Sequence, residues 1–175
     1  KNYSKNDTLS ILDIGTGSGC IVLSLLKLFK NFRGVAIDIS KKALNVAKYN
    51  AKMHQLDNRV KFFKSSVDNF FKGKYDLIVS NPPYINNKSL KYLDEGIFKY
   101  EPVVALEGGV EGLSLIKKVI IGSSKLLKKS GKLILEIGYD QKYKVKKLLE
   151  NEKFYVNKIV YDYAKNPRCV ISTKL

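Results

Sequence analysis

A glycine-rich turn that follows a short apolar segment restricts the fold of this chain more than any other feature of its sequence. Residues 9–14 have the composition of a short buried strand, and residues 18–30 have apolar positions too dense for a surface helix. The glycines of the connecting segment, residues 15–19 (GTGSG), permit a tight turn and a close approach of the backbone to a ligand. A strand, a glycine turn and a helix in this order predict the first unit of a parallel sheet.

The remaining sequence continues the alternation of strands and helices. Further buried strands are predicted at residues 34–38, 60–63, 75–80 and 131–137. Helices are predicted from the N-cap Ser40 through about His54, from about 112 to 127, and from 140 to 151. In the first of these, the residues expected to face the core are Ala43, Leu44, Val46 and Ala47. The last two predicted strands, at about 154–161 and 168–174, have no long helix between them and should pair antiparallel.

This order of elements predicts an α/β fold. We expect a doubly wound, Rossmann-like, seven-stranded and mostly parallel sheet that ends in an antiparallel strand pair. The length of 175 residues suits one domain, residues 1–175. Residues 84–110 show no clear periodicity, and so long a stretch inside a compact domain is typical of a functional segment.

The glycine spacing of the turn is the one expected for a nucleoside cofactor that has no phosphate chain beside the turn. Its pattern is G-x-G-x-G, not the G-x-G-x-x-G of dinucleotide sites, and it lacks the Gly-Lys-Ser/Thr of a phosphate-binding loop. The shorter pattern suits a cofactor that carries a carboxylate and an ammonium. Asp38, at the end of the second predicted strand, can accept hydrogen bonds from both hydroxyls of a ribose. This acidic residue alone does not choose between NAD and S-adenosylmethionine.

A second motif, Asn81-Pro82-Pro83-Tyr84, directly follows the fourth predicted strand. The first and fourth strands should flank the switch in strand order, where open parallel sheets bind ligands. The side-chain oxygen of Asn81 and the backbone carbonyl of Pro82 can accept the two N–H groups of a planar nitrogen. The ring of Tyr84 offers a flat face for stacking on it. The two motifs together predict methyl transfer from S-adenosylmethionine to an amide or amino nitrogen, with Asn81, Pro82 and Tyr84 as the catalytic residues.

Composition limits the other possibilities. The net charge of +16 would attract nucleic acid, but only Arg33, Arg59 and Arg168 are arginines and the many lysines are scattered, which is typical of a solvated surface. The single histidine, His54, and the two distant cysteines, Cys20 and Cys169, predict no metal site and no disulfide. No apolar run reaches the roughly 18 residues of a membrane span. We therefore expect a cytoplasmic protein that binds no membrane. We also expect a monomer, although no sequence feature determines the oligomeric state.

At this point the chain resembles the HemK/PrmC family, the protein-(glutamine-N5) methyltransferases of peptide-chain release factors. The similarity covers nearly the whole chain, and the segments that carry it are 11–19, 78–85, Tyr100-Glu101-Pro102, Ala105-Leu106, Leu135-Glu136-Ile137-Gly138, Asp162-Tyr163 and Asn166-Pro167-Arg168. The resemblance implies that the amide of the glutamine in a Gly-Gly-Gln loop is methylated and that S-adenosylhomocysteine is the second product.

The resemblance also implies a role for each motif residue. The methionine part of the cofactor would be held by Gly15, Thr16, Gly17, Ser18 and Gly19, and its ribose by Asp38. Asn81 would contact both cofactor and substrate, and Pro82, Pro83 and Tyr84 would complete the glutamine pocket.

The sequence departs from the family in two places. Where the family usually has an aspartate beside the adenine, this chain has Ser66, so we expect the backbone of Val67 to serve, with Asp68 as a less favoured substitute. The helical N-terminal domain of the family is absent from these residues, so we expect residues 1–175 to be the catalytic domain alone.

Several alternatives stay open. Asn-Pro-Pro-Tyr is shared with adenine-N6 nucleic-acid methyltransferases, and a catalytic domain alone can be a cofactor-binding fragment with little activity; an NAD-linked oxidoreductase is a distant third. Asp13 either supports the glycine turn or meets the ammonium of the cofactor, and Glu101 and Glu136 either line the pocket or are solvated. Packing in the core or at its rim is expected for Tyr139, Tyr143, Tyr161 and Tyr163.

Overall fold

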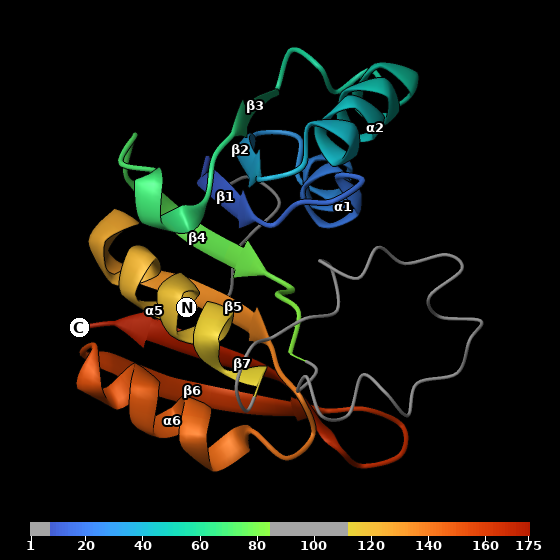
Figure 1. The fold of residues 1–175 in the computed structure, drawn as a ribbon. Helices are drawn as coiled ribbons and strands as arrows, with labels where there is room; N and C mark the ends of the chain where they lie inside the picture. Colours follow the sequence, from blue (N-terminus) through green and yellow to red (C-terminus); the bar gives the residue numbers. More distant parts are fainter. Residues whose placement is uncertain (1–7, 85–111) are drawn as a thin grey trace.

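The computed structural model describes residues 8–84 and 112–175, which form one seven-stranded sheet with helices packed on it (Figure 1). The strands are β1 Ser10–Ile14, β2 Arg33–Asp38, β3 Val60–Lys64, β4 Tyr75–Ser80, β5 Leu127–Glu136, β6 Phe154–Tyr161 and β7 Pro167–Lys174. The helices are α1 Cys20–Leu28, α2 Lys41–Met53, α5 Ser114–Leu126 and α6 Lys142–Asn151, with a 3₁₀ turn, η1, at Val67–Asn69.

The strand order is β3-β2-β1-β4-β5-β7-β6, which Figure 1 shows from top to bottom. The pairs β1–β2, β2–β3, β1–β4 and β4–β5 are parallel, whereas β5–β7 and β6–β7 are antiparallel. The expected fold class is therefore confirmed, as is the pairing of the last two strands. The strand order reverses between β1 and β4, so the chain places its switch point where the two sequence motifs follow their strands.

The central strands β1 and β4 are buried on both faces, which explains why their sequences are nearly continuous apolar runs. Alternate residues of β1 and β4 point to opposite sides: Leu12 and Ile78 belong to the core under α5 and α6. Ile11 and Leu77 belong to the second core, which α1 and α2 cover. Among the described residues, no helix is long and apolar enough to cross a membrane.

Helix α2 begins as the sequence predicts, because the Ser40 hydroxyl accepts a hydrogen bond of 3.2 Å from the backbone N–H of Ala43. The predicted core face needs one correction. The buried residues of α2 are Leu44, Ala47 and Ala51, while Val46 is 49% exposed. A stripe with spacings of three and four residues covers the sheet, and Val46 lies outside it.

Strand β5 begins four residues earlier than its sequence predicts. Leu127 pairs with Tyr75, and the register then shifts before Leu77 pairs with Lys132. The intervening Lys-Lys-Ser-Gly sequence is typical of a turn, and Ser130 adopts a positive φ of 61°. The extra pairing depends on Leu127, whose side chain is fully buried in the core under α5 and α6.

Candidate functional site

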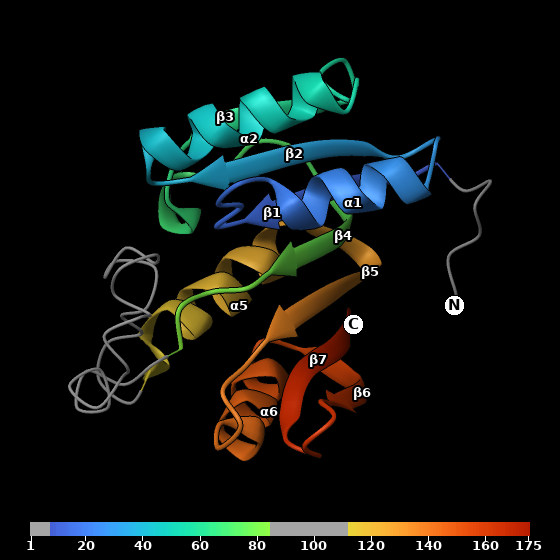
Figure 2. The same ribbon diagram turned by 90° about the vertical axis from the view of Figure 1, so that its right-hand side faces the viewer.

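The parallel strands end at one edge of the sheet and bring both sequence motifs there. Ile14 of β1 pairs with Ile37 of β2 and with Ser80 of β4. The glycine turn, Asp38 and Asn81 therefore leave the sheet side by side. Figure 2 shows the arrowheads of β1, β2, β4 and β5 pointing to the same side of the molecule. The Ser80 hydroxyl donates a hydrogen bond of 2.8 Å to the carbonyl of Ile14, which ties the two strand ends together.

The glycine turn depends on backbone conformations that favour glycine. Gly15, Gly17 and Gly19 have φ values of 71°, 56° and 83°. A Cβ atom added to Gly15 or Gly17 would meet no atom within 4 Å, so both positions border open space at the sheet edge. A Cβ atom at Gly19 would instead lie 3.1 Å from Leu23 and 3.2 Å from Ala47. The first two glycines leave room for a ligand, and the third lets α1 pack closely on α2.

Asp13 supports this turn from below. Its carboxylate oxygen Oδ2 accepts hydrogen bonds from the Thr16 hydroxyl, at 2.8 Å, and from the backbone N–H of Val22, at 3.3 Å. The residue is only 1% exposed, and Oδ1 is buried without a hydrogen-bond partner among the described residues. Burial raises the pKa of the Asp13 carboxyl from 3.8 to about 6, although the bonds from Thr16 and Val22 oppose that rise. The first alternative for Asp13, support of the turn, is thus met by two contacts.

Asp38 joins the glycine turn to α2. Its Oδ2 accepts the backbone N–H of Gly17 at 2.9 Å, and its Oδ1 accepts the backbone N–H of Ser40 at 2.8 Å. Each carboxylate oxygen has a second lone pair, so these two bonds leave capacity for further donors. A second link holds the turn, because the side-chain amide of Asn50 donates to the Ser18 carbonyl at 2.9 Å.

The segment after β3 also approaches this edge. The backbone N–H of Ser65 donates to the Asp38 carbonyl at 3.0 Å, and η1 begins two residues later at Val67. The Val67 side chain is buried in the core beneath α5, so its backbone alone is available to a ligand. The Asp68 carboxylate forms an ion pair of 2.9 Å with Lys118 of α5.

The Asn-Pro-Pro-Tyr segment carries side chains in different environments. Asn81 is exposed, Pro82 is buried, and Pro83 and Tyr84 are half-buried. The Tyr84 hydroxyl donates to the Glu136 carboxylate at 3.2 Å, so Glu136 contacts the Asn-Pro-Pro-Tyr segment. Burial raises the pKa of Tyr84, and the negative charge of Glu136 raises it further.

One residue that contacts the Asn-Pro-Pro-Tyr segment, Gln141, was not predicted from the sequence. Gln141 is 3% exposed, and its amide nitrogen donates to the carbonyls of Tyr84 and Gly112, at 3.2 Å each. Its position just before a lysine-rich helix predicts a surface residue, so only its place after Leu-Glu-Ile-Gly could have singled it out. The predicted residues Ile85, Tyr100, Glu101, Pro102, Ala105 and Leu106 lie outside the described residues.

The tyrosines expected to pack in the core or at its rim are exposed instead. The exposed fractions of Tyr139, Tyr143, Tyr161 and Tyr163 are 63%, 77%, 49% and 110%. Tyr143 lies in the first turn of α6, Tyr139 follows β5, and Tyr161 and Tyr163 lie at the end of β6 and in the turn after it. The Lys142 ammonium lies over the rings of Tyr143 and Tyr161 and donates a hydrogen bond of 3.0 Å to the Tyr161 hydroxyl.

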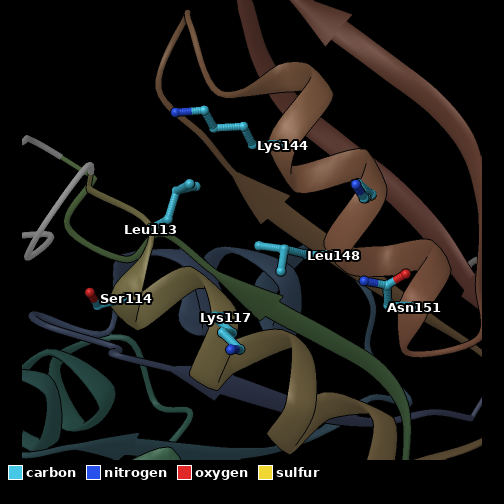
Figure 3. Close-up of a pocket in the computed structure, with 7 residues that line it drawn as sticks. Leu113, Ser114, Lys117, Lys144, Leu148 and Asn151 are labelled. Carbon is cyan, nitrogen blue, oxygen red and sulfur yellow. The ribbon is translucent and has the colours of Figure 1, made fainter.

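Two hollows in the described surface lie apart from the glycine turn. A groove of about 410 Å³ separates α5 from α6, with Lys117 on one side and Lys144 on the other (Figure 3). A second hollow, of about 280 Å³, follows β3 and is lined by residues that include Phe63, Ser65 and Asn69. None of the residues predicted to bind cofactor or substrate lines either hollow.

The site fits a cofactor that has an ammonium group and a ribose. The space above Gly15 and Gly17 is open, the buried oxygen Oδ1 of Asp13 lies at the base of the turn, and the Asp38 carboxylate lies beside it. Within residues 8–84 and 112–175, no three His, Cys, Asp or Glu side chains gather in a way that could hold a metal ion.

Comparison with known proteins adds a family assignment to this geometry. The family model described as methyltransferase small domain matches residues 1–100. The release factor glutamine methyltransferase of Agrobacterium fabrum is 36% identical over 165 residues, which are 94% of this chain and 57% of that protein. The ribosomal protein uL3 glutamine methyltransferase of Francisella tularensis is 43% identical over 137 residues, which are 78% of this chain and 43% of that protein.

These relatives confirm the resemblance to glutamine methyltransferases that the sequence motifs indicated, and this chain spans about half of their length. Solved structures agree on the fold alone. A methyltransferase from Pyrococcus furiosus superposes with a TM-score of 0.73 at 19% identity over 98% of this chain and 77% of that one. The ribosomal protein L11 methylase from Lactobacillus delbrueckii subsp. bulgaricus has a TM-score of 0.71 at 23% identity, over 97% of this chain and 72% of that one.

Proposed function

Because this chain belongs to the methyltransferase small domain family, we propose that it methylates the N5 side-chain amide of the glutamine in the Gly-Gly-Gln motif of a peptide-chain release factor. The main support for this proposal is that the glycine turn and Asn81 follow the ends of two neighbouring strands. Relatives named release factor glutamine methyltransferase, at 36% to 40% identity over most of this chain, support the choice of substrate.

Three parts of the sheet edge would hold the cofactor. When bound, S-adenosylmethionine supplies a methyl group on a positively charged sulfur. The segment from Gly15 to Gly19, with Thr16, Gly17 and Ser18, would hold its amino-acid part, because the backbone there is open to a close approach. The Asp38 carboxylate would accept the ribose hydroxyls, and the backbone of Val67 would face the adenine.

The Asn-Pro-Pro-Tyr segment would hold the amide to be methylated. The side-chain oxygen of Asn81 and the carbonyl of Pro82 would accept the two N–H groups of the glutamine amide, while Pro83 and Tyr84 complete its pocket. An amide nitrogen is a poor nucleophile because its lone pair is delocalised. Two acceptors orient it and stabilise the positive charge that develops as the carbon–nitrogen bond forms. The nitrogen loses its extra proton after transfer.

The decisive experiment is mass spectrometry of an intact release factor after incubation with this protein and methyl-labelled S-adenosylmethionine. We expect one added methyl group on the glutamine of Gly-Gly-Gln, and replacement of that glutamine by alanine should abolish it. Methylated adenine in an added nucleic acid, without methylglutamine, would instead support an adenine-N6 methyltransferase. Cofactor binding in calorimetry without any transfer would support a binding fragment.

A second protein substrate merits the same assay because one relative, 43% identical, is named ribosomal protein uL3 glutamine methyltransferase. The chemistry at the amide would be the same, so only the protein that presents the glutamine differs. Equal amounts of release factor and uL3 in one reaction would reveal which is methylated faster.

We propose that the enzyme acts as a monomer in the cytoplasm, where translation takes place.

A further inference from the structure

Gln141 joins two parts of the backbone that are distant in sequence. Its Nε2 donates to the Tyr84 carbonyl at the end of Asn-Pro-Pro-Tyr and to the Gly112 carbonyl just before α5, at 3.2 Å each. Its own orientation is fixed because Oε1 accepts the backbone N–H of Gly138 at 2.8 Å. A buried amide held at both ends has one orientation, so it sets the position of what it binds.

Gly112 shows how closely these backbones approach each other. It has a φ of +67°, and a Cβ atom there would lie 2.1 Å from the Tyr84 carbonyl oxygen and 2.8 Å from Nε2 of Gln141. No side chain can be accommodated at either distance. The Tyr84 backbone is therefore in direct contact with the chain that enters α5.

Tyr84 is held at a second point by the same stretch of chain. Its hydroxyl donates to Glu136, at the end of β5, at 3.2 Å. Glu136 and Gln141 are five residues apart, and between them they hold the hydroxyl and the carbonyl of one tyrosine. The connection from β5 to α6 thus fixes both the backbone and the ring of Tyr84.

We propose that Gln141 is a positioning residue for methyl transfer, which acts by fixing the Tyr84 backbone while Glu136 fixes the Tyr84 ring. This inference rests on the proposed function, in which Asn81 to Tyr84 hold the acceptor amide. A displacement of about 1 Å at a reacting group can lower a rate about a hundredfold. The contribution of Gln141 is therefore to the rate of transfer and not to cofactor affinity.

The test uses Gln141→Glu, which keeps the shape of the side chain but replaces the donating NH₂ group by an oxygen that faces two carbonyls. We expect kcat for release factor to fall about 10- to 100-fold, as the loss of hydrogen bonds to a buried group predicts. The dissociation constant of S-adenosylmethionine should stay within about twofold of wild type. The matched control is Gln55→Glu, because Gln55 is exposed and the change in charge is the same.

A second pair of variants tests the role of Glu136 independently of Gln141→Glu. Glu136→Gln keeps an oxygen that can accept the Tyr84 hydroxyl, so it should retain most of the activity. Glu136→Ala removes the acceptor and should lose about tenfold in kcat. Equal activity of both Glu136 variants and wild type would overturn the role of Glu136, and a folded Gln141→Glu variant with wild-type kcat would overturn that of Gln141.

Hydrogen exchange separates this inference from the proposed function. In Gln141→Glu, the backbone amides of Asn81 and Tyr84 should exchange faster than in wild type, whatever the substrate; Pro82 and Pro83 between them have no N–H. If wild type methylates no Gly-Gly-Gln protein, the proposed function fails, and the exchange rates still show whether Gln141 holds the segment. Unchanged exchange in these residues would contradict the positioning role.

Discussion

The backbone N–H of Gly17 donates a hydrogen bond of 2.9 Å to Oδ2 of Asp38, which joins the glycine turn to the end of β2. The other oxygen of Asp38 accepts the backbone N–H of Ser40 at 2.8 Å, at the start of α2. One carboxylate therefore sets the distance between the turn that would hold the amino-acid part of a cofactor and the strand end that would hold its ribose.

Replacing Asp38 by alanine removes this link and the proposed ribose acceptor together. We expect the affinity for S-adenosylmethionine to fall about 10- to 100-fold, since hydrogen bonds to a charged group contribute about 1.5–3 kcal/mol. Isothermal titration calorimetry measures the change, and Asp57→Ala at an exposed position is the control. An Asp38→Ala variant that binds the cofactor as tightly as wild type would contradict the ribose role.

The glycines of the turn should respond differently to substitution by alanine. Gly17→Ala adds a methyl group to open space and Gly19→Ala adds one against Leu23 and Ala47, while both incur the cost of a positive φ, about 1 kcal/mol or more. Gly19→Ala should therefore lose more stability in urea unfolding. Gly17→Ala should lose more affinity for S-adenosylmethionine relative to its loss of stability. If the loss of cofactor affinity stood in the same ratio to the loss of stability in both variants, Gly17 would have no specific role beside the cofactor.

Asp13 should make stability depend on pH. Because burial raises its pKa from 3.8 to about 6, the folded protein binds this proton more tightly than the unfolded chain does. The contribution of Asp13 to the free energy of unfolding is greatest below the pKa that its carboxyl has in the unfolded chain. This contribution is lost as the pH rises from about 4 through 6. The loss is up to roughly 3 kcal/mol, since one pKa unit is about 1.4 kcal/mol.

The Asp13 prediction is checked by urea unfolding of wild type and Asp13→Asn at pH 4 and pH 7. Wild type should lose stability relative to the variant between these two values. Asp57→Asn, at an exposed position, serves as the control. A difference between wild type and Asp13→Asn that does not vary with pH would show that the carboxyl does not titrate in this range.

Asn81 should affect the rate of transfer more than cofactor binding. Asn81→Ala removes one of two proposed acceptors for the amide, and loss of one such group costs about 100-fold or more in kcat. The dissociation constant of S-adenosylmethionine should rise less than tenfold, because most contacts of the cofactor would be with the glycine turn and Asp38. Asn58→Ala on the surface is the control. Single-turnover kinetics separates the two effects, and a variant weakened only in cofactor binding would contradict the role in transfer.

Asp162 should stabilise the turn between β6 and β7. The backbone N–H of Asn166 and the Arg168 guanidinium donate to it, at 2.8 Å and 3.0 Å, and these contacts lower its pKa below 3.8. The contribution of the Asp162 carboxylate to folding stability is present above the pKa that it has in the unfolded chain. This contribution is lost as the pH falls through the lower pKa that it has in the folded protein. Asp162→Ala should therefore lower the melting temperature at pH 7 and have less effect near pH 2. An equal effect at both values would exclude a role for the charge.

Local sequence predicted the strands and turns because their determinants are local. The apolar segments before Gly15 and Asn81 become β1 and β4, and Ser40 begins α2 as its side chain predicts. The placement of both motifs at one edge also followed, because parallel strands share a direction and the order reverses where motifs of this kind occur. Val46 was wrongly predicted to face the core, because α2 has more apolar residues than its buried face holds.

The contacts that hold the site could not be predicted from sequence patterns, because they join residues far apart along the chain. Tyr84 and Glu136 are separated by 52 positions, and Tyr84 and Gln141 by 57. The exposure of Tyr139 and Tyr163 likewise depends on which residues the folded chain covers, and that is not a property of their sequence neighbours.

The sequence by itself determined the α/β architecture, the glycine turn and the position of Asn81 after β4, because hydrophobic periodicity and backbone conformation are properties of neighbouring residues. Only the tertiary structure decided that Glu136 and Gln141 hold Tyr84 and that Asp38 holds Gly17. A side-chain hydrogen bond forms where the packed strands and helices leave two groups about 3 Å apart, and that distance exists only after the chain has folded.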